Sequence, residues 1–282
     1  MPSPLAHPAQ PVQPGGDETS PAAPTAADAH RPRRRRARRV AKIVALSLLA
    51  ALVVAVGAFL VWANDTYAAE PDGIAAVRDD PRVRLDDQGD AVVMTPTGAS
   101  DGRGLVFLAG AKVEPQAYAA TFHELAAEGT TVVVVEPFLH LAILERRPFE
   151  AFTALAADVE VWAVGGHSMG GVRACTYAES EEVDALVLLA SYCSLGDLSG
   201  RADLAALSVS GTQDALVSQE TIDESLPLMP EDTELVRIEG ASHAQFGDYG
   251  PQSGDGTPTI TDDEARARIT EALVPFLTSA GR

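Results

Sequence analysis

The chain has 282 residues, of which 46% are apolar and 22% charged, and its formal net charge is −19. This apolar fraction is typical of a packed domain and too high for a wholly disordered chain. Its two cysteines exclude a disulfide-rich scaffold and a cysteine-based structural zinc site. Residues 64–282 hold 13 basic and 37 acidic residues, so this part repels phosphates and we expect no nucleic acid partner for it.

The first 42 residues differ in composition from the rest of the chain. Residues 1–30 are rich in Pro, Ala, Gln, Ser and Gly and have almost no large apolar side chains, which predicts a disordered tail. Seven arginines follow within Arg31–Arg39, and Lys42 comes after them. A basic run of this kind also fits a nuclear localisation or nucleic-acid patch. Its place beside a long apolar run favours a role in membrane topology instead.

Ile43–Ala63 is a run of 21 residues that contains no charge. As a helix it would be about 30 Å long, which is the thickness of a bilayer core. Trp62 stands at one end, where an aromatic anchor is expected. Because arginines stay on the cytoplasmic side, we predict a single-pass cell-membrane protein with a cytoplasmic N-terminus and an extracytoplasmic domain. A signal peptide cleaved near Ala68 and Ala69 is the alternative, although the run exceeds the usual h-region of about 7–15 residues.

The polar segment 64–90 predicts a linker and a first strand. Val83–Leu85 in this segment and Ala91–Met94 directly after it are expected to pair as a hairpin. From Gly104 onward, short apolar runs alternate with amphipathic stretches, and continuous apolar runs suit strands buried on both faces. Residues 91–282 are therefore predicted to form one α/β domain with a doubly wound, mostly parallel sheet. The expected strands are Leu105–Leu108, Thr131–Val135, Val161–Val164, Ala185–Leu189, Ala206–Val209 and Leu235–Ile238, and the expected helices are Tyr118–Glu128, Phe149–Ala156, Met169–Ala178 and Asp262–Thr278, the last capped by Thr261 and Glu264.

Ligands of such sheets bind beyond the carboxyl ends of the strands. The segment Gly166-His167-Ser168-Met169-Gly170 follows a predicted strand, precedes a predicted helix and matches G-x-S-x-G. The glycines at 166 and 170 allow close packing around a tight turn that exposes the serine hydroxyl. We predict Ser168 as a nucleophile and the Met169 N–H as a donor to an oxyanion. The alternative is a glycine-rich turn with an incidental serine.

A serine hydroxyl needs a base to accept its proton and a carboxylate to orient that base. Of the six histidines, His243 lies in the loop after the last predicted strand, where the histidine of the order Ser, acid, His belongs. Asp214 lies just past a predicted strand and a glycine turn, and it is the candidate acid. Competing acids lack that preceding strand; they are Asp197, Asp203, Asp223 and Asp232.

The second oxyanion donor is expected from the loop after Leu105–Leu108. The N–H of Ala111 and that of Lys112 are both candidates, and the residues do not decide between them. The Lys112 side chain either adds positive charge to the site or is simply solvated. The sequence contains no HExxH or GxxxxGK[ST] pattern, so we expect no metal ion and no organic cofactor.

With these residues, the chain from about Ala91 to Arg282 resembles the α/β-hydrolase superfamily, and within it the compact bacterial group related to dienelactone hydrolase (carboxymethylenebutenolidase-like). The resemblance implies a Ser168–Asp214–His243 triad on an eight-stranded type of sheet. Dienelactone hydrolases use a cysteine nucleophile where this chain has serine, so their substrate does not carry over. About a dozen residues around Ser194–Leu204 separate two strands, which leaves no room for a sizeable lid. The segments that carry the resemblance are 110–118, 165–171 and 241–250.

These patterns predict a membrane-anchored serine hydrolase that cleaves carboxylic esters or related acyl bonds of a small-molecule substrate through an acyl-enzyme. A non-catalytic binding module of the cell envelope and an acyltransferase with the same triad are the alternatives, because one fold hosts many functions. Cys175 and Cys193 are either buried thiols or a disulfide, which is permitted outside the cytoplasm. The residues indicate neither the natural substrate nor the oligomeric state.

Overall fold

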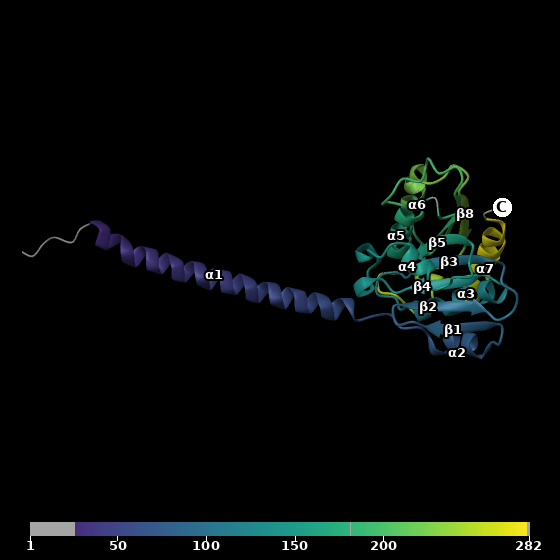
Figure 1. The fold of residues 1–282 in the computed structure, drawn as a ribbon, viewed down its shortest axis with the longest axis horizontal. Coiled ribbons are helices and arrows are strands. Elements are labelled where there is room, and N and C mark those ends of the chain that lie inside the picture. The colour runs from purple at the N-terminus through teal and green to yellow at the C-terminus, as the bar shows by residue number, and fades with distance from the viewer. Residues whose placement is uncertain (1–25, 181, 281–282) are drawn as a thin grey trace, which may run out of the picture. The chain divides into compact units, whose positions relative to one another are not determined.

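A computed structural model describes residues 26–180 and 182–280 of the chain (Figure 1). The chain divides into two units, residues 1–57 and 58–282. The first 25 residues of the predicted tail lie outside the described residues.

Helix α1 (Ala26–Ala63) contains the predicted membrane span. Within it, Arg34–Ala63 is long and apolar enough to cross a membrane, with a mean hydropathy of 2.8 in its most apolar window and no buried residue in that window. The helix begins well before Ile43, so it includes residues 26–42, which we expected to belong to the disordered tail. Alanine and arginine are strong helix formers, and a helix extends more easily than it nucleates.

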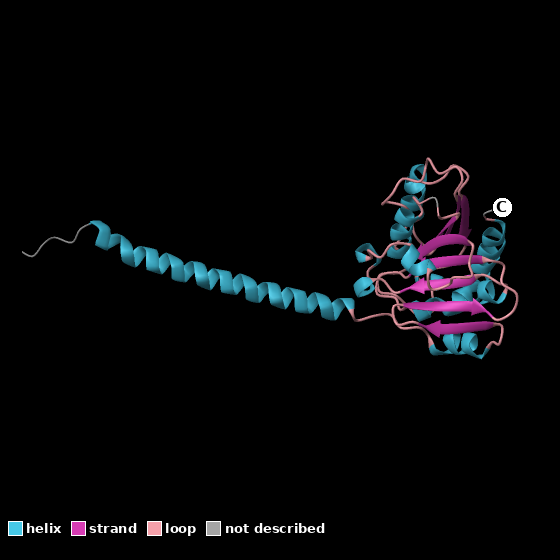
Figure 2. Cartoon of the chain, viewed as in Figure 1, coloured by secondary structure: helices cyan, strands magenta, loops and turns pink. Residues whose placement is uncertain are grey.

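The second unit is built on an eight-stranded sheet with the order β1-β2-β4-β3-β5-β6-β7-β8 (Figure 2). The first two strands are antiparallel to their neighbours, and all later neighbours are parallel. The chain runs from β3 outward to β4 and then returns past β3 to β5, so the direction of winding changes between β3 and β5. Sheets of this kind bind ligands at that switch point, beyond the carboxyl ends of the strands. The strands are β1 (Val83–Asp87), β2 (Ala91–Pro96), β3 (Arg103–Leu108), β4 (Thr131–Val135), β5 (Val161–His167), β6 (Ala185–Leu189), β7 (Ala205–Gly211) and β8 (Glu234–Ile238).

Helices cover both faces of the sheet, as the doubly wound prediction requires. Alternate residues of a strand enter different cores: Val132 packs with side chains of α2, α3 and α7, whereas Val133 packs with side chains of α4 and α5. Both valines are fully buried, which explains why β4 is apolar from Val132 to Val135. The α-helices are α2 (Pro71–Asp79), α3 (Ala119–Ala127), α4 (Glu150–Thr153), α5 (Met169–Tyr177), α6 (Gln219–Ser225) and α7 (Asp262–Ser279), and the short 3-10 helices are η1 (Pro115–Tyr118), η2 (Phe138–His140), η3 (Ala142–Leu144), η4 (Leu226–Leu228) and η5 (Ala244–Phe246).

Local sequence signals correspond well to these elements. Each predicted strand overlaps an observed one, the hairpin of β1 and β2 is present, and Thr261 and Glu264 form the predicted capping box of α7. The segment between β6 and β7 contains no helix, in keeping with the absence of a sizeable lid. The expected linker differs from the structure, because its residues include α2 and the buried side chain of Val77.

Candidate active site

The tight turn between β5 and α5 is built around Ser168. This residue has φ 52° and ψ −123°, a strained conformation for a residue with a side chain. The flanking glycines are required by space: a Cβ on Gly166 would lie 2.2 Å from the Gly170 carbonyl carbon, and one on Gly170 would lie 2.1 Å from the Leu108 oxygen. The turn therefore has the tight strand-to-helix geometry expected around Ser168, and this serine is partly exposed.

Backbone strain is concentrated at the carboxyl edge of the sheet. Among the described residues, every non-glycine residue with positive φ lies just beyond β3, β4, β5 or β6. Such conformations persist only where the surrounding structure enforces them, and they cluster at functional sites. The edge that the topology marks for ligand binding is thus also the strained one. The residues are Lys112, Leu139, His140, Ser168 and Ala190.

His243 and Asp214 form a buried pair at this edge. His243 Nδ1 lies 2.8 Å from Asp214 Oδ2, and both side chains have no exposed surface. The other carboxylate oxygen, Oδ1, accepts the N–H groups of Leu216 and Val217, each at 2.8 Å, which fixes the orientation of Asp214. A carboxylate only accepts, so His243 donates from Nδ1, and in the neutral ring this leaves Nε2 as the acceptor. That Nε2 is buried without a hydrogen-bond partner among the described residues, Ser168 included.

The backbone of His243 is held by two residues to which the sequence assigned no role in the site. Asp255 accepts the His243 N–H at 3.1 Å and the Ala244 N–H at 2.9 Å. The carbonyl of His243 accepts a hydrogen bond from Nε2 of His167 at 3.2 Å. No sequence signal distinguished Asp255, which is one of many acids in an irregular loop.

His167, at the variable position of the motif, belongs to a buried chain of hydrogen bonds. Its Nδ1 lies 3.0 Å from the hydroxyl of Tyr118, which in turn accepts the Gly110 N–H at 2.9 Å. Burial holds the pKa of His167 well below its usual value, and the neighbouring His243 ring lowers it further. Burial raises the pKa of Tyr118, so the neutral hydroxyl donates to the neutral imidazole. These buried hydrogen bonds therefore connect the loop after β3, the elbow and the loop that carries His243.

The structure distinguishes between the two candidates for the second oxyanion donor. The Lys112 N–H donates to the His140 carbonyl at 2.8 Å and is therefore occupied. Within the described part of the chain, the N–H groups of Met169 and Ala111 have no hydrogen-bond acceptor. The Lys112 side chain is 12% exposed, so of the two alternatives for this lysine the freely solvated one does not hold. Its ammonium lies 5.0 Å from the ring of Trp62.

Comparison with known proteins identifies the fold family. The model of the alpha/beta hydrolase family matches residues 104–267 of the chain, which includes the elbow, Asp214 and His243. The chain belongs to the alpha/beta hydrolase family. No curated protein matches the chain.

Solved structures of other alpha/beta folds resemble this hydrolase at low sequence identity. Est1E from Butyrivibrio proteoclasticus, in a structure with ferulic acid bound, is 15% identical with a TM-score of 0.50, and the match covers 71% of this chain and 98% of that one. The esterase domain of a Rhodothermus marinus protein is 16% identical with a TM-score of 0.49, covering 70% and 97% of the two chains. TT1662 from Thermus thermophilus is also 16% identical with a TM-score of 0.49, covering 70% and 98%.

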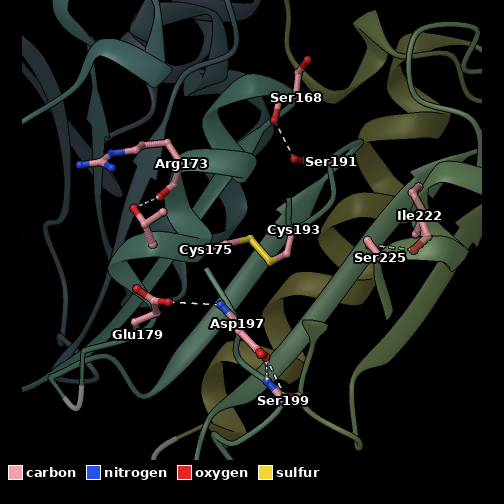
Figure 3. Close-up of a disulfide and its surroundings, with 11 residues drawn as sticks. Ser168, Arg173, Cys175, Glu179, Ser191, Cys193, Asp197, Ser199, Ile222 and Ser225 are labelled. Carbon is pink, nitrogen blue, oxygen red and sulfur yellow. Dashed lines mark hydrogen bonds between the residues drawn. A yellow bond between two sulfur atoms is a disulfide. The ribbon is translucent and has the colours of Figure 1, made fainter. Parts of the chain in front are cut away.

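A disulfide joins Cys175 on α5 to Cys193 in the segment after β6, and so decides between the two predicted states of these cysteines. Their Cα atoms are 5.8 Å apart. Figure 3 shows this bond together with the hydrogen bond in which Ser191 Oγ donates to the Ser168 carbonyl at 2.6 Å. The hydrolase thus fastens the elbow and its helix to the segment after β6 at two points.

Two cavities adjoin the carboxyl edge of the sheet. One, of about 190 Å³, lies beside His243 and is lined by Ala244, Gly247 and Asp255 among others. The other, of about 570 Å³, is lined by Glu136 and by apolar residues after β4 that include Phe138. Burial raises the pKa of Glu136. Among the residues that the structure describes, no three His, Cys, Asp or Glu side chains are grouped so as to hold a metal ion.

Proposed function

We propose that this alpha/beta hydrolase is a serine hydrolase that cleaves carboxylic esters or related acyl bonds. The observation that carries the proposal is the buried hydrogen bond between His243 and Asp214, which leaves Nε2 of His243 without a partner. The loop that carries His243 contacts the Ser168 turn through His167. A buried imidazole with its Nδ1 proton held by a carboxylate is prepared to accept a proton at Nε2. Catalytic hydrogen bonds between a serine and its base are often long in the absence of substrate. A His243 Nε2 that has no hydrogen bond to Ser168 is therefore compatible with this role.

The proposed reaction has two halves that use the same groups. Ser168 Oγ attacks the ester carbonyl carbon while His243 Nε2 accepts its proton, and the oxyanion accepts hydrogen bonds from the Met169 and Ala111 N–H groups. His243 then gives the proton to the leaving alkoxide, and an acyl-enzyme and an alcohol result. Water attacks the acyl carbon with His243 again as the base, which releases the acid and restores the Ser168 hydroxyl. Asp214 orients His243 and stabilises its cation throughout.

The finer assignment to the dienelactone hydrolase-like group is part of the same proposal. It is supported by the segments around Gly110, Ser168 and His243, all of which lie at one edge of the sheet. Because the elbow holds serine where dienelactone hydrolases have cysteine, the dienelactone substrate is not part of the proposal.

We further propose that α1 spans the cell membrane, with the arginine cluster in the cytoplasm and the hydrolase domain outside. The length and hydropathy of Arg34–Ala63 support a span, and the positive-inside rule supports this orientation. The Cys175–Cys193 disulfide supports an oxidising compartment for the domain, because cytoplasmic disulfides are rare.

The test is covalent labelling of the full chain in detergent with a fluorophosphonate probe, read by intact mass, together with turnover of a short-chain ester. We expect one adduct that Ser168→Ala abolishes, and a loss of turnover of at least about a thousandfold in both Ser168→Ala and His243→Ala. His123→Ala is the matched control, because its Nε2 also lies 2.8 Å from a carboxylate, that of Asp80, away from the elbow. The absence of both adduct and turnover in the folded wild-type protein would refute the proposal and favour a binding module.

A further inference from the structure

The segment that leaves α1 is attached to the loop that carries the proposed oxyanion donor Ala111. We call residues 64–70 the exit segment. The Tyr67 N–H donates to the Lys112 carbonyl at 2.6 Å, and the Tyr67 carbonyl accepts the Glu114 N–H at 3.0 Å. The Thr66 hydroxyl adds a bond to the Glu114 carboxylate at 2.8 Å. The exit segment therefore pairs with this loop through a short parallel β-bridge and is not a linker without contacts to the domain.

The exit segment also contacts the loop that follows His243. The Glu70 N–H donates to the Asp248 carbonyl at 2.8 Å, and the rings of Tyr67 and Tyr249 pack with their centroids 5.6 Å apart. Both loops that bear proposed catalytic groups are thus tied to a few residues directly after the apolar helix.

Lys112 extends this attachment back to the end of α1 itself. Its ammonium lies 5.0 Å from the ring centroid of Trp62 and 5.8 Å from that of Tyr67, within the range of cation–π attraction. Asp65 provides an acidic partner at 3.6 Å. Ala63, the last residue of α1, is fully buried. These contacts lie within the second compact unit, so they do not depend on the direction in which the rest of the helix points.

The position of the site follows from these contacts. A span over Ile43–Ala63 places Trp62 at the membrane interface, where tryptophan is enriched. Lys112 contacts Trp62, and Ala111 immediately precedes Lys112 in the chain. On the proposed span, the oxyanion loop is therefore attached to a residue that lies at the depth of the lipid headgroups.

A second loop near Lys112 exposes large apolar side chains. The Lys112 N–H donates to the carbonyl of His140, which lies between Phe138 and Ile143. Phe138 is 64% exposed and Ile143 is 46% exposed, although the surface of this domain is strongly acidic. These two side chains are available for contact with lipid on the side of the domain where the Lys112 loop lies.

From these contacts we infer that the hydrolase takes its ester from the membrane that anchors it. The substrate class is a lipid-borne acyl ester whose carbonyl lies at headgroup depth. This inference rests on the proposed function and on the proposed span. The tether explains how an acidic, water-soluble domain reaches such a substrate: the exit segment keeps the site at the bilayer surface permanently.

The test uses the full chain reconstituted in phosphatidylcholine vesicles and two fluorogenic esters of the same alcohol, one short and water-soluble and one long-chain and vesicle-borne. A spacer of 20 Gly and Ser residues is inserted between Ala63 and Asn64, which leaves the exit segment intact but lets the domain move about 25 Å from the surface. The control is the same spacer inserted between Gly98 and Ala99, in an exposed loop.

We expect the first insertion to reduce turnover of the vesicle-borne ester at least fivefold relative to that of the soluble ester, and the control insertion to leave this ratio unchanged. An unchanged ratio after the first insertion would overturn the inference, as would a wild-type protein that turns over only the soluble ester. A wild-type protein that turns over neither ester would instead refute the proposed function, so the two failures are distinct.

Discussion

Replacement of Tyr118 by phenylalanine should reduce catalysis although this side chain is fully buried and cannot touch substrate. The substitution removes one oxygen that accepts the Gly110 N–H at 2.9 Å and donates to His167 at 3.0 Å. A buried donor without an acceptor costs about 1–3 kcal/mol. A shift of the loop after β3 that gives the Gly110 N–H a new acceptor therefore lowers the free energy of the variant. Ala111 is the next residue, and its N–H moves with the loop.

The size of the effect follows from the value of an oxyanion donor. Complete loss of one donor lowers kcat by about 10²–10³. A displaced donor retains part of its effect, so we expect Tyr118→Phe to lower kcat by about tenfold to a hundredfold, with little change in KM. The assay is ester turnover divided by the number of sites that a fluorophosphonate probe titrates, which removes any contribution from unfolded protein.

Tyr177→Phe is the matched control for this substitution. The Tyr177 hydroxyl is likewise bonded to the backbone, since it donates to the Arg147 carbonyl at 2.7 Å, but it lies at the far end of α5 from Ser168. Both variants should lose about 1 kcal/mol or more of unfolding free energy, measured in urea. The reasoning would be refuted by a Tyr118→Phe protein whose kcat per titrated site equals that of Tyr177→Phe.

Three further predictions concern stability. The pKa of His167 is low in the native state, while an unfolded histidine titrates near pH 6.5. The unfolding free energy should therefore fall as the pH drops below 6.5, by about 1.4 kcal/mol per pH unit for this proton. Urea titrations of the His167→Gln variant should lack this contribution. A proton uptake on unfolding that is identical in the two proteins would contradict the assignment. Gly170→Ala should cost about 3 kcal/mol in a thermal unfolding assay, because its Cβ would lie 2.1 Å from a backbone oxygen of β3; a wild-type melting temperature would contradict this. The double substitution of Cys175 and Cys193 by serine should cost about 3 kcal/mol, since the disulfide closes a loop of 18 residues, and reducing agent should then have no further effect on urea unfolding.

Most of the fold and part of the site could be predicted from the sequence because their signals are local. An apolar run without charge identifies the candidate span, and the alternation of apolar and amphipathic segments identifies the strands and helices. The elbow is also local, since two glycines around Ser168 are needed wherever a strand turns sharply into a helix. Asp214 and His243 could be selected because each follows a strand, and parallel strands bring their carboxyl ends to one edge.

Tertiary contacts decided what the sequence left open. Whether Ala111 or Lys112 presents its N–H depends on the His140 carbonyl, which lies 28 residues further along the chain and occupies the Lys112 donor. Tertiary contacts also determine the Cys175–Cys193 disulfide and the hydrogen bond by which Asp255 holds the His243 backbone. They likewise determine the pairing of the exit segment, whose polar composition suggested a linker. Each of these depends on groups that are distant in sequence and meet only when the sheet has formed. A hydrogen bond needs a partner within about 3 Å, and no composition or periodicity carries that distance.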